Sequence, residues 1–450
     1  MIPLLKEKNS TEMKMSKIAI VGSGIGAMAS AYDLKKLGHQ VFLFEKNDYF
    51  GGHTHTHNFR YNNYDYTVDT GFLVHNDRTY PNLIKFFDEL ELETYPSEMT
   101  FSVHSVSDDL EWCGDNLKTV FAQKKNLLRP RFYLFLKEIL RFNKNADRHL
   151  QEAKEDLKLN LGDLLSHERY SQDFQDWYLL PMGGCIWSCP TKEMLNFPAF
   201  TFLSFCKNHG LLQIADRPQW KTIVGGCNTY TNRVLSLLDG TFKNEEIVKV
   251  IPLGNTKGVR IETNQRTEDF DAVFFGPHPP QTLQLVKGIN NKVDEVLSAF
   301  KYQKNTAYLH TDIKQLPDRE QAWAAWNYRT ISKADRSKAV SVSYLINKLQ
   351  PLPKDVQMIV TLNPFDEISK DKIIKELNYE HPLFDQKAIS AQREVQEIQG
   401  QSQMYFSGAW MRYGFHEDGI WGAKQALKQF EKDFHQTSQT TSGLSDSATF

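Results

Sequence analysis

The segment Lys17–Thr56 constrains the fold of this chain more than any other stretch. A short apolar run is followed by a glycine-rich turn, a helical pattern, a second apolar run and an acid. In such a unit the first glycine permits a tight turn, the second lets the backbone approach a pyrophosphate, and the acid binds ribose hydroxyls. The segment therefore predicts a site for an adenine dinucleotide without a 2′-phosphate, formed by Gly22, Ser23, Gly24, Ile25, Gly26, Ala27, Glu45 and Lys46.

A second pair of glycines favours FAD over NAD as that dinucleotide. Gly51 and Gly52 follow Glu45 within seven residues, and Asp69-Thr70-Gly71 follows where the chain returns to a strand. An NAD-binding unit needs no further motif after its acid. The extra glycines therefore indicate a longer cofactor that remains in contact with the chain beyond its ribose.

Composition and charge exclude several classes of protein. The chain has 450 residues, more than one ordinary core accommodates, so we expect two closely joined domains. A net charge of −2 gives no indication of nucleic-acid binding. No window approaches the roughly 20 apolar residues of a membrane span, and the N-terminal leader lacks the features of a signal peptide. We therefore expect a cytoplasmic protein with reduced cysteines, of which Cys185 and Cys189 are expected to be buried thiols.

The sequence predicts no metal site. Cys185 and Cys189 have three residues between them, a spacing that fits neither a redox pair nor half of a zinc site. The alternating residues His53, His55 and His57 suggest a metal cluster by their type. We favour the alternative that they are exposed or bonded to the backbone.

Hydrophobic periodicity divides the chain into alternating α/β segments. The FAD-binding domain is expected to consist of three separate segments, at 16–80, 216–290 and 396–432. The intervening segments would form a substrate domain, largely helical at 81–215 and sheet-forming at 291–395. The Ser/Thr-rich segment 433–450 is expected to be a disordered tail.

The motifs together resemble the FAD-binding amine-oxidase and phytoene-desaturase superfamily, which has a glutathione-reductase-type fold with an inserted α+β substrate domain. In that superfamily an acid precedes Gly-Gly-Arg, and an Asp-x-Gly motif follows. His53 stands here in place of the arginine, and Ala409 in place of a C-terminal acid. The resemblance implies an oxidoreductase with further cofactor contacts at Gly51, Gly52, His53, Thr54, Gly71, Phe72, Leu73, Val248, Gly408, Ala409, Gly419, Ile420 and Ala423.

A closer resemblance covers about Lys17 to Gln429. The chain is similar to bacterial NAD/FAD-binding oxidoreductases encoded beside cyclopropane-fatty-acid synthases, and to the N-terminal domain of plant cyclopropane synthases. This implies oxidation, desaturation or isomerisation of an unsaturated or methylated fatty acyl chain, and a lipid-modifying methyltransferase or synthase as a partner. The resemblance rests on the phrases HTHT, TGFLVHNDRTYPNL, YLLPMGGCIWSCP, PQWKTIVGGCNTY, YLHTD, AWAAWNY and SGAWMRYGFHEDGIWGA.

The alternatives are an amine or polyene oxidase with the same fold, or an auxiliary flavoprotein that supports a synthase. No cysteine lies near the C-terminal motif, so we expect non-covalent FAD. Catalytic residues are not fixed by any motif; the candidates are Arg412, Tyr413 and His416, with the alternative that His416 and Glu417 only hold their loop.

Basic and aromatic residues interleave between Lys124 and Lys144. Such a helix is either an ordinary one with a buried and a solvated face, which we favour, or one that lies on an anionic membrane. The second alternative would place a cytoplasmic enzyme at the inner membrane face, where lipid or other apolar substrates gather.

Overall fold

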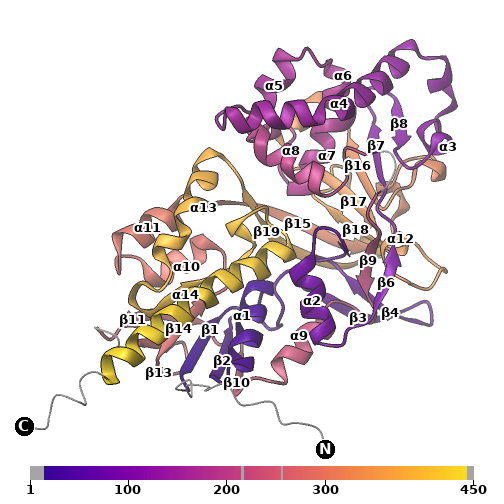
Figure 1. The fold of residues 1–450 in the computed structure, drawn as a ribbon. Helices are drawn as coiled ribbons and strands as arrows, with labels where there is room; N and C mark the ends of the chain where they lie inside the picture. Colours follow the sequence, from indigo (N-terminus) through magenta and orange to yellow (C-terminus); the bar gives the residue numbers. More distant parts are fainter. Residues whose placement is uncertain (1–14, 214–216, 255–256, 443–450) are drawn as a thin grey trace, which may run out of the picture.

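A parallel sheet forms the centre of one half of the molecule. The computed structural model describes residues 15–213, 217–254 and 257–442. All neighbouring strands of this five-stranded sheet are parallel (Figure 1). Their order is β10 (Gly240–Lys243), β2 (Gln40–Glu45), β1 (Lys17–Val21), β14 (Ala272–Phe275) and β20 (Met404–Phe406).

Both faces of this sheet are covered, which explains why its central strands are nearly continuous apolar runs. Successive residues of β1 point to opposite faces. Ile18 and Ile20 join the core beneath α1 (Ile25–Lys36) and α14 (His416–Ser442). The opposite core contains Ala19 and Val21. It is covered by the antiparallel strands β11 (Ile247–Pro252), β12 (Val259–Thr263) and β13 (Thr267–Phe270), and by α11 (Asn291–Ser298) and α13 (Gln386–Ile398).

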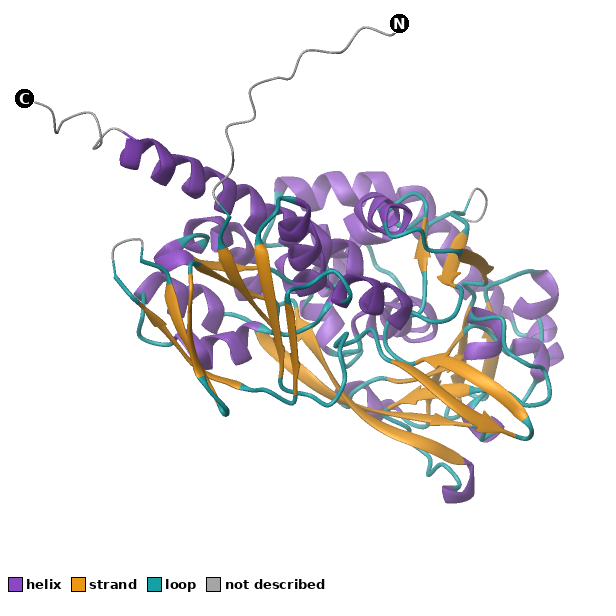
Figure 2. Ribbon diagram, turned by 90° about the horizontal axis from the view of Figure 1, so that it is seen from below, coloured by secondary structure: helices purple, strands orange, loops and turns teal. Residues whose placement is uncertain are grey.

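A seven-stranded mixed sheet forms the centre of the other half. β15 and β19 are long and lie between the two halves (Figure 1), and the two main sheets occupy opposite sides of the molecule (Figure 2). Within the described residues, the only parallel neighbours in this sheet are β16 and β7. The strand order is β19 (Ile373–Leu383), β15 (Lys301–His310), β18 (Ile359–Leu362), β17 (Ser341–Leu345), β16 (Trp326–Thr330), β7 (Phe101–Ser105) and β8 (Leu110–Cys113).

Helices from the middle of the chain gather beside this sheet (Figure 1). The longest is α4, whose apolar positions recur at helical spacing and bury Phe132, Phe135 and Phe142. The helices of this group are α3 (Leu117–Val120), η1 (Lys124–Leu128), α4 (Pro130–Glu155), α5 (Leu161–His167), α6 (Gln172–Phe174), α7 (Leu180–Trp187) and α8 (Ala199–Asn208).

Short elements connect the two halves. β3 (Thr56–Tyr61) and β4 (Tyr64–Asp69) form a hairpin, and β9 (Trp220–Ile223) pairs with β5 (His75–Asn76) and β6 (Thr94–Ser97). Further helices are α2 (Pro81–Glu89), α9 (Asn228–Leu235), α10 (Pro279–Val286) and α12 (Ile346–Leu349). No helix among the described residues is both long and apolar enough to span a bilayer.

The α/β fold class predicted from the sequence is confirmed. The start of the disordered tail, expected at residue 433, is corrected, because α14 continues to Ser442. Phe430 and Phe434 pack edge-on against His39, which holds this end of the helix to the core. Once a helix is anchored, each further residue adds a hydrogen bond at little cost. Residues 443–450 lie outside the described residues.

Candidate functional site

A cavity of about 1230 Å³ runs from the parallel sheet into the helical group. It is larger than the roughly 300–1,000 Å³ of an ordinary small-molecule pocket. The residues predicted to bind the cofactor that line it are Gly22, Ser23, Gly24, Ile25, Gly26, Glu45, Lys46, Gly51, Gly52, His53, Gly71, Phe72, Leu73, Gly408 and Ala409.

The glycine-rich turn has the geometry that a pyrophosphate requires. Gly22 has a φ of +76°, and a Cβ on Gly24 would meet no atom within 4 Å. Gly24 is also the N-cap of α1, so the free N–H groups of the first turn face the cavity. We call this part of the cavity, beside the glycine-rich turn and Glu45, the dinucleotide groove. Gly52 approaches Gly24 so closely that a Cβ would lie 3.3 Å from the Gly24 Cα. The two glycine motifs therefore form one wall of the groove.

Glu45 lies at the carboxyl end of β2, where the first motif ends. Its Oε2 accepts a hydrogen bond from the Ser23 hydroxyl at 2.5 Å, and its Oε1 accepts one from the Asn47 N–H at 2.9 Å. The Gly51 N–H in turn donates to the Ser23 oxygen at 2.9 Å. Ser23 thus ties the acid of the first motif to the glycine pair of the second.

His53 fits the role of an anchor for the cofactor. Its Nε2 is buried without a hydrogen-bond partner, and the side chain lines the cavity. Burial and the neighbouring His381 and His278 hold the pKa of His53 well below its usual value, so the ring is neutral. A neutral imidazole N–H can donate to a phosphate or ribityl oxygen, although with less strength than an arginine.

His55 and His57 take no part in a metal cluster with His53 among the described residues. His55 stacks on Tyr49 with ring centroids 3.8 Å apart, and His57 Nε2 lies 3.0 Å from the Thr70 hydroxyl. The expectation of exposed histidines is corrected for His57, which is buried. Because side chains alternate along an extended chain, His55 and His57 lie on the same side, where their rings pack against each other.

Hydrogen bonds from distant parts of the chain hold the Asp-x-Gly motif at the wall of the cavity. Asp69 is buried and accepts hydrogen bonds from the Cys227 N–H at 3.0 Å and from the Gln350 amide at 2.8 Å. Phe72 stacks on His416, with ring centroids 3.7 Å apart. Asp69 therefore holds the turn, and the residues after it face the cavity.

His416 is the catalytic candidate that lies deepest in the site. It lines the cavity, and its Nε2 is 3.1 Å from the Thr54 hydroxyl. Burial lowers the pKa of His416 to about 3, so the ring is neutral at physiological pH. The side chain can supply a hydrogen bond but not a positive charge.

The other candidates of this loop have different roles. Tyr413 lines the cavity, whereas Arg412 lies outside it, beside Trp421 and 3.7 Å from Asp418. Glu417 accepts hydrogen bonds from the N–H groups of Asn82 and Leu83 at the start of α2. Glu417 is thus a helix cap that joins α14 to α2, which supports the structural alternative for this residue.

Several predicted contact residues lie behind the cavity wall. Ala27 packs against Gly276, where a Cβ on the glycine would lie 2.5 Å away. Gly419 packs against Ile25 in the same way, and Ile420 and Ala423 belong to the core beneath α1. Thr54 is buried beside Tyr230. These residues shape the site through close packing of the helices and do not line the cavity.

The predicted contact of the backbone near Val248 stays a prediction, and the residues that line the cavity here precede Val248 in the chain. The Val248 side chain is half exposed, whereas Ile247 lines the cavity together with Glu245 and Glu246. A one-residue difference in a strand reverses which side chains face inward. The sequence also carried no signal for Pro277, His278 and Tyr302, which line the same region but belong to no cofactor motif.

Beyond Phe72 the cavity continues as a branch with apolar walls. One wall is α4, where Leu136, Ile139, Leu140 and Asn143 recur at the spacing of one helical face. The sheet and the other helices supply the remaining walls, with Trp112, Leu117, Val120, Tyr178, Met182, Cys185, Ile186, Trp187, Phe205, Trp326 and Tyr344. We call this region the apolar branch.

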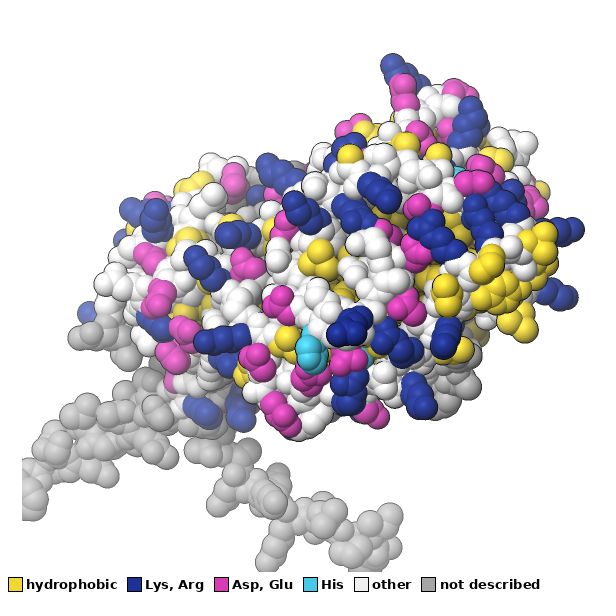
Figure 3. All heavy atoms as spheres, turned by 90° about the horizontal axis from the view of Figure 1, so that it is seen from above, with side chains coloured by type: hydrophobic (Ala, Val, Ile, Leu, Met, Phe, Trp, Pro, Cys, Tyr) yellow, Lys and Arg dark blue, Asp and Glu magenta, His cyan; other side chains and the backbone are white. Residues whose placement is uncertain are grey.

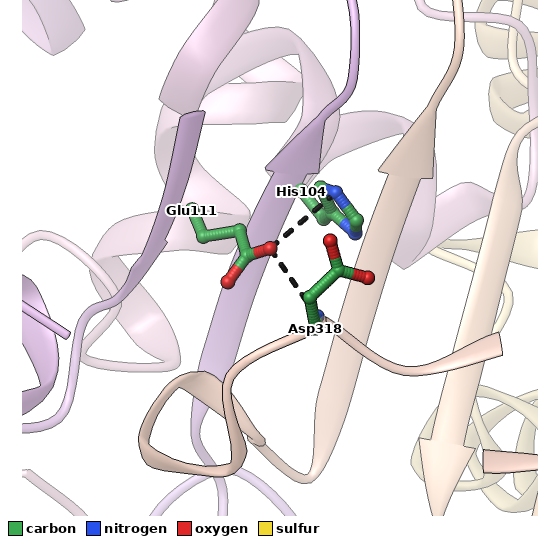
Figure 4. Close-up of side chains that lie close together, drawn as sticks. All are labelled: His104, Glu111 and Asp318. Carbon is green, nitrogen blue, oxygen red and sulfur yellow. Dashed lines mark hydrogen bonds and ion pairs between the residues drawn. The ribbon is translucent and has the colours of Figure 1, made fainter. Parts of the chain in front are cut away.

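Among the described residues, two other groups of acids and histidines have the residue types of a metal centre. His104, Glu111 and Asp318 lie close together (Figure 4), but Arg319 Nη1 is 3.1 Å from Glu111 Oε2, and Arg329 donates to His104 Nδ1 at 2.8 Å. In the group His149, Glu152 and Glu168, Arg148 Nη2 lies 2.6 Å from Glu168. Arginines compete for these ligand atoms, so neither group is suited to a metal. All five cysteines are free and buried, which includes Cys185 and Cys189, the two thiols that were predicted to be buried.

Comparisons with known sequences match the N-terminal motif. The family described as NAD(P)-binding Rossmann-like domain matches residues 20–90. This chain is 58% identical to 1-hydroxycarotenoid 3,4-desaturase of Flavobacterium sp. (strain P99-3) over 41 residues, which are 9% of its length. Over 43 residues, 10% of this chain, it is 42% identical to the flavin-dependent L-tryptophan oxidase RebO of Lentzea aerocolonigenes. The alignments span only 8% and 9% of these two relatives.

Comparisons with solved structures cover nearly the whole chain. A CLA-producing fatty acid isomerase from P. acnes has a TM-score of 0.65 and 16% identity, over 92% of this chain and 98% of its own. Putrescine oxidase bound to putrescine has a TM-score of 0.65 and 15% identity, over 93% and 99%. Cyclohexylamine oxidase from Brevibacterium oxydans has a TM-score of 0.65 and 14% identity, over 93% and 99%.

The fold of this chain is therefore the fold that these solved structures share, and it is the fold that the sequence predicted. The structural neighbours include oxidases and an isomerase, so the fold itself does not select a substrate. The closer resemblance to proteins encoded beside cyclopropane-fatty-acid synthases stays a prediction.

Proposed function

We propose that this chain is an FAD-dependent oxidoreductase that acts on an unsaturated or methylated fatty acyl chain. The observation that carries the proposal is the continuity of the cavity from the dinucleotide groove, past Phe72 and His416, into the apolar branch. FAD supplies a flavin ring that accepts or returns a hydride. An acyl chain in the branch would reach that ring at the point where the two regions meet.

The groove fits non-covalent FAD. The open space at Gly24 leaves room for a pyrophosphate. The N–H groups at the N-terminus of α1 and the unpartnered Nε2 of His53 offer it hydrogen-bond donors. Glu45 offers acceptors to a ribose. No cysteine is within the residues of the C-terminal loop that line the cavity, Gly408 to His416.

The walls of the apolar branch favour a hydrocarbon over an amine. An ammonium group that leaves water is stabilised by a carboxylate or by the faces of aromatic rings, and the aromatic rings of the branch are the feature that fits the amine alternative. A hydrocarbon is favoured because the residues of α4 that line the cavity include no buried carboxylate. The helix face formed by Leu136, Ile139 and Leu140 carries no charge, and Asp115, which lines the cavity at α3, is exposed to solvent. Transfer of an acyl chain from water to such walls contributes roughly 0.8 kcal/mol for each buried methylene group.

Among the structural neighbours, the fatty acid isomerase supports the proposal by analogy, and the amine oxidases support the alternative. His416 and Tyr413 lie where the two regions meet. A neutral His416 could orient a substrate or cofactor oxygen through its N–H without changing the local charge. The cytoplasmic location and the partnership with a lipid-modifying synthase belong to the same proposal.

The test is anaerobic reduction of the purified, flavin-loaded protein. Unsaturated phospholipid or free fatty acid should bleach the flavin absorbance, whereas putrescine and cyclohexylamine should not. Bleaching by an amine alone would overturn the acyl assignment. An isomerase would return the hydride, so product analysis by mass spectrometry must accompany the spectra. No change of flavin or lipid would instead favour an auxiliary flavoprotein.

A pair of variants separates the apolar branch from the cofactor groove. Ile139→Asn places a polar amide in the branch and should slow acyl-dependent bleaching at least about tenfold, the equivalent of about 1.4 kcal/mol, with the bound flavin unchanged. Leu157→Asn is the matched control, because Leu157 is partly exposed and lies outside the cavity. Equal bleaching rates in the two variants would contradict an acyl site in the branch.

A further inference from the structure

An unusual set of exposed apolar side chains surrounds the beginning of α4. Of the fifteen large hydrophobic side chains exposed among the described residues, six lie within residues 117–140. Leu117 and Leu128 are 78% and 88% exposed. We call this set the leucine patch: Leu117, Leu127, Leu128, Tyr133, Leu134 and Leu140. Single exposed leucines are ordinary, but a group of them on one surface marks an interaction site.

The backbone beneath the patch is held by hydrogen bonds. At the start of α3, the Asn116 side chain accepts from the Thr119 N–H at 3.2 Å, and the Asn116 N–H donates to the Thr119 hydroxyl at 3.0 Å. In η1 the Leu127 carbonyl accepts from the Tyr133 hydroxyl at 3.0 Å. These capping contacts present the leucines to solvent on a defined surface, so their exposure is built into the fold.

Positive charge accompanies the patch. Figure 3 shows apolar side chains gathered at one end of the molecule, with Lys and Arg side chains around them. Among the described residues, Lys118, Lys124, Lys137 and Lys144 form no ion pair, whereas Lys125 pairs with Asp109. Unpaired lysines around an apolar patch match a surface that is negatively charged outside and apolar beneath.

The cavity reaches this surface. Leu117 and Leu140 are both members of the exposed patch and lining residues of the apolar branch. Leu136, about one turn away from Leu140 on the same helix, and Ile139, which precedes Leu140, continue the branch inward. An acyl chain could therefore pass from the patch into the cavity along an apolar path.

We infer that the leucine patch docks on an anionic lipid bilayer and that the apolar branch opens into that bilayer. The inference rests on the proposed function and deepens it, because it names the source of the acyl substrate. Leucines that project outward insert into the acyl region of a bilayer, and the unpaired lysines around them contact its anionic head groups. The bilayer supplies both an anionic surface and chains that can enter without crossing water.

The experiment measures vesicle binding of the flavin-loaded protein by flotation, without turnover. The probes are vesicles that contain phosphatidylglycerol and vesicles of phosphatidylcholine alone, each at low and high salt. We expect binding to phosphatidylglycerol vesicles that salt weakens. The triple variant Lys118→Gln, Lys124→Gln, Lys137→Gln should lose about fivefold in affinity for each lysine at low salt. Leu117→Ser with Leu128→Ser should lose at least about tenfold, because both side chains leave the acyl region.

Matched controls show whether the position of each change matters. Lys287→Gln, Lys387→Gln and Lys432→Gln remove the same charge from exposed lysines outside the patch. Leu237→Ser replaces another exposed leucine, which follows the end of α9. These variants should bind vesicles as the unmodified protein does. Flavin absorbance and the melting temperature verify that every variant is folded.

Three results would overturn the inference. They are the absence of vesicle binding, binding that survives the leucine changes, and a patch-dependent dimer in solution that excludes vesicles. The last result would assign the patch to a second copy of the chain. The readout is independent of the proposed reaction. Vesicle binding with neither acyl-dependent bleaching nor a changed lipid product would refute the function alone. Bleaching or product formation with free fatty acid, without vesicle binding, would refute the docking alone.

Discussion

The contrast between Gly24 and Gly26 tests how the turn holds its cofactor. The two glycines belong to one motif, but their surroundings differ. A Cβ at Gly24 would enter open space, whereas a Cβ at Gly26 would lie 3.0 Å from the Gly408 nitrogen and 3.1 Å from its Cα. Valine at position 24 should therefore obstruct the groove, and valine at position 26 should disturb the packing of α1 against the C-terminal loop.

The expected magnitudes follow from these contacts. In Gly24→Val the pyrophosphate can no longer approach the N-terminus of α1. Two hydrogen bonds to a charged group at about 1.5–3 kcal/mol each are then lost, so that FAD affinity falls roughly 10²–10⁴-fold. The apoprotein loses about 1 kcal/mol or less, since Gly24 has φ −66° and only its cap preference changes. Gly26→Val should cost about 1–3 kcal/mol through overpacking.

Calorimetric titration of the apoproteins with FAD and urea unfolding without FAD separate the two effects. The reasoning would be refuted if Gly24→Val bound FAD with nearly the unmodified affinity. It would equally fail if Gly24→Val destabilised the apoprotein as much as Gly26→Val does. In either case the open space at Gly24 would not be the place that the pyrophosphate occupies.

Three further predictions concern single side chains. His53→Ala should weaken FAD binding about tenfold, measured by titration, because the buried Nε2 loses its role as donor; an unchanged affinity would remove His53 from the site. Glu417→Ala should lower the free energy of unfolding by about 1–2 kcal/mol in urea, because the N–H groups at the start of α2 lose their acceptor; its flavin spectrum should be retained. Burial lowers the pKa of His310 to about 4, below the 6.5 of an exposed histidine, so the unfolded state binds the extra proton and stability falls as pH drops from 6.5 towards 4. His310→Gln should reduce that slope by at most about 1.4 kcal/mol per pH unit, and identical slopes would contradict a buried neutral ring.

Local sequence predicted the dinucleotide half of the site better than the rest. The glycine turn, its helix and the strand that ends at Glu45 form a contiguous unit, so their spacing carries their geometry. Strand β10, in contrast, has four residues with a lysine at its end and no fully buried side chain, and no local pattern marks it. It joins the sheet because Gly240–Lys243 pairs with β2, a partner far away in the sequence.

The candidate site shows the same division. The C-terminal run from Gly408 to Glu417 was identifiable as a motif, but its residues could not be assigned to roles. The structure places His416 in the cavity, Glu417 on the end of α2 and Arg412 outside. Neighbouring positions on a loop and a helix start point in different directions, and only contacts with α2 and α1 decide which side chain faces the cavity.

The sequence by itself determined that the chain carries a Rossmann-like unit suited to an adenine dinucleotide, and its glycine pairs favoured FAD. Turn conformation, helix capping and strand period are set by residues close together in the chain, so a motif can encode them. The tertiary structure alone decided that the groove continues into an apolar branch and that this branch meets the leucine patch. Those features join α4, the seven-stranded sheet and the loop after β20, whose contacts arise from packing between segments far apart in the chain.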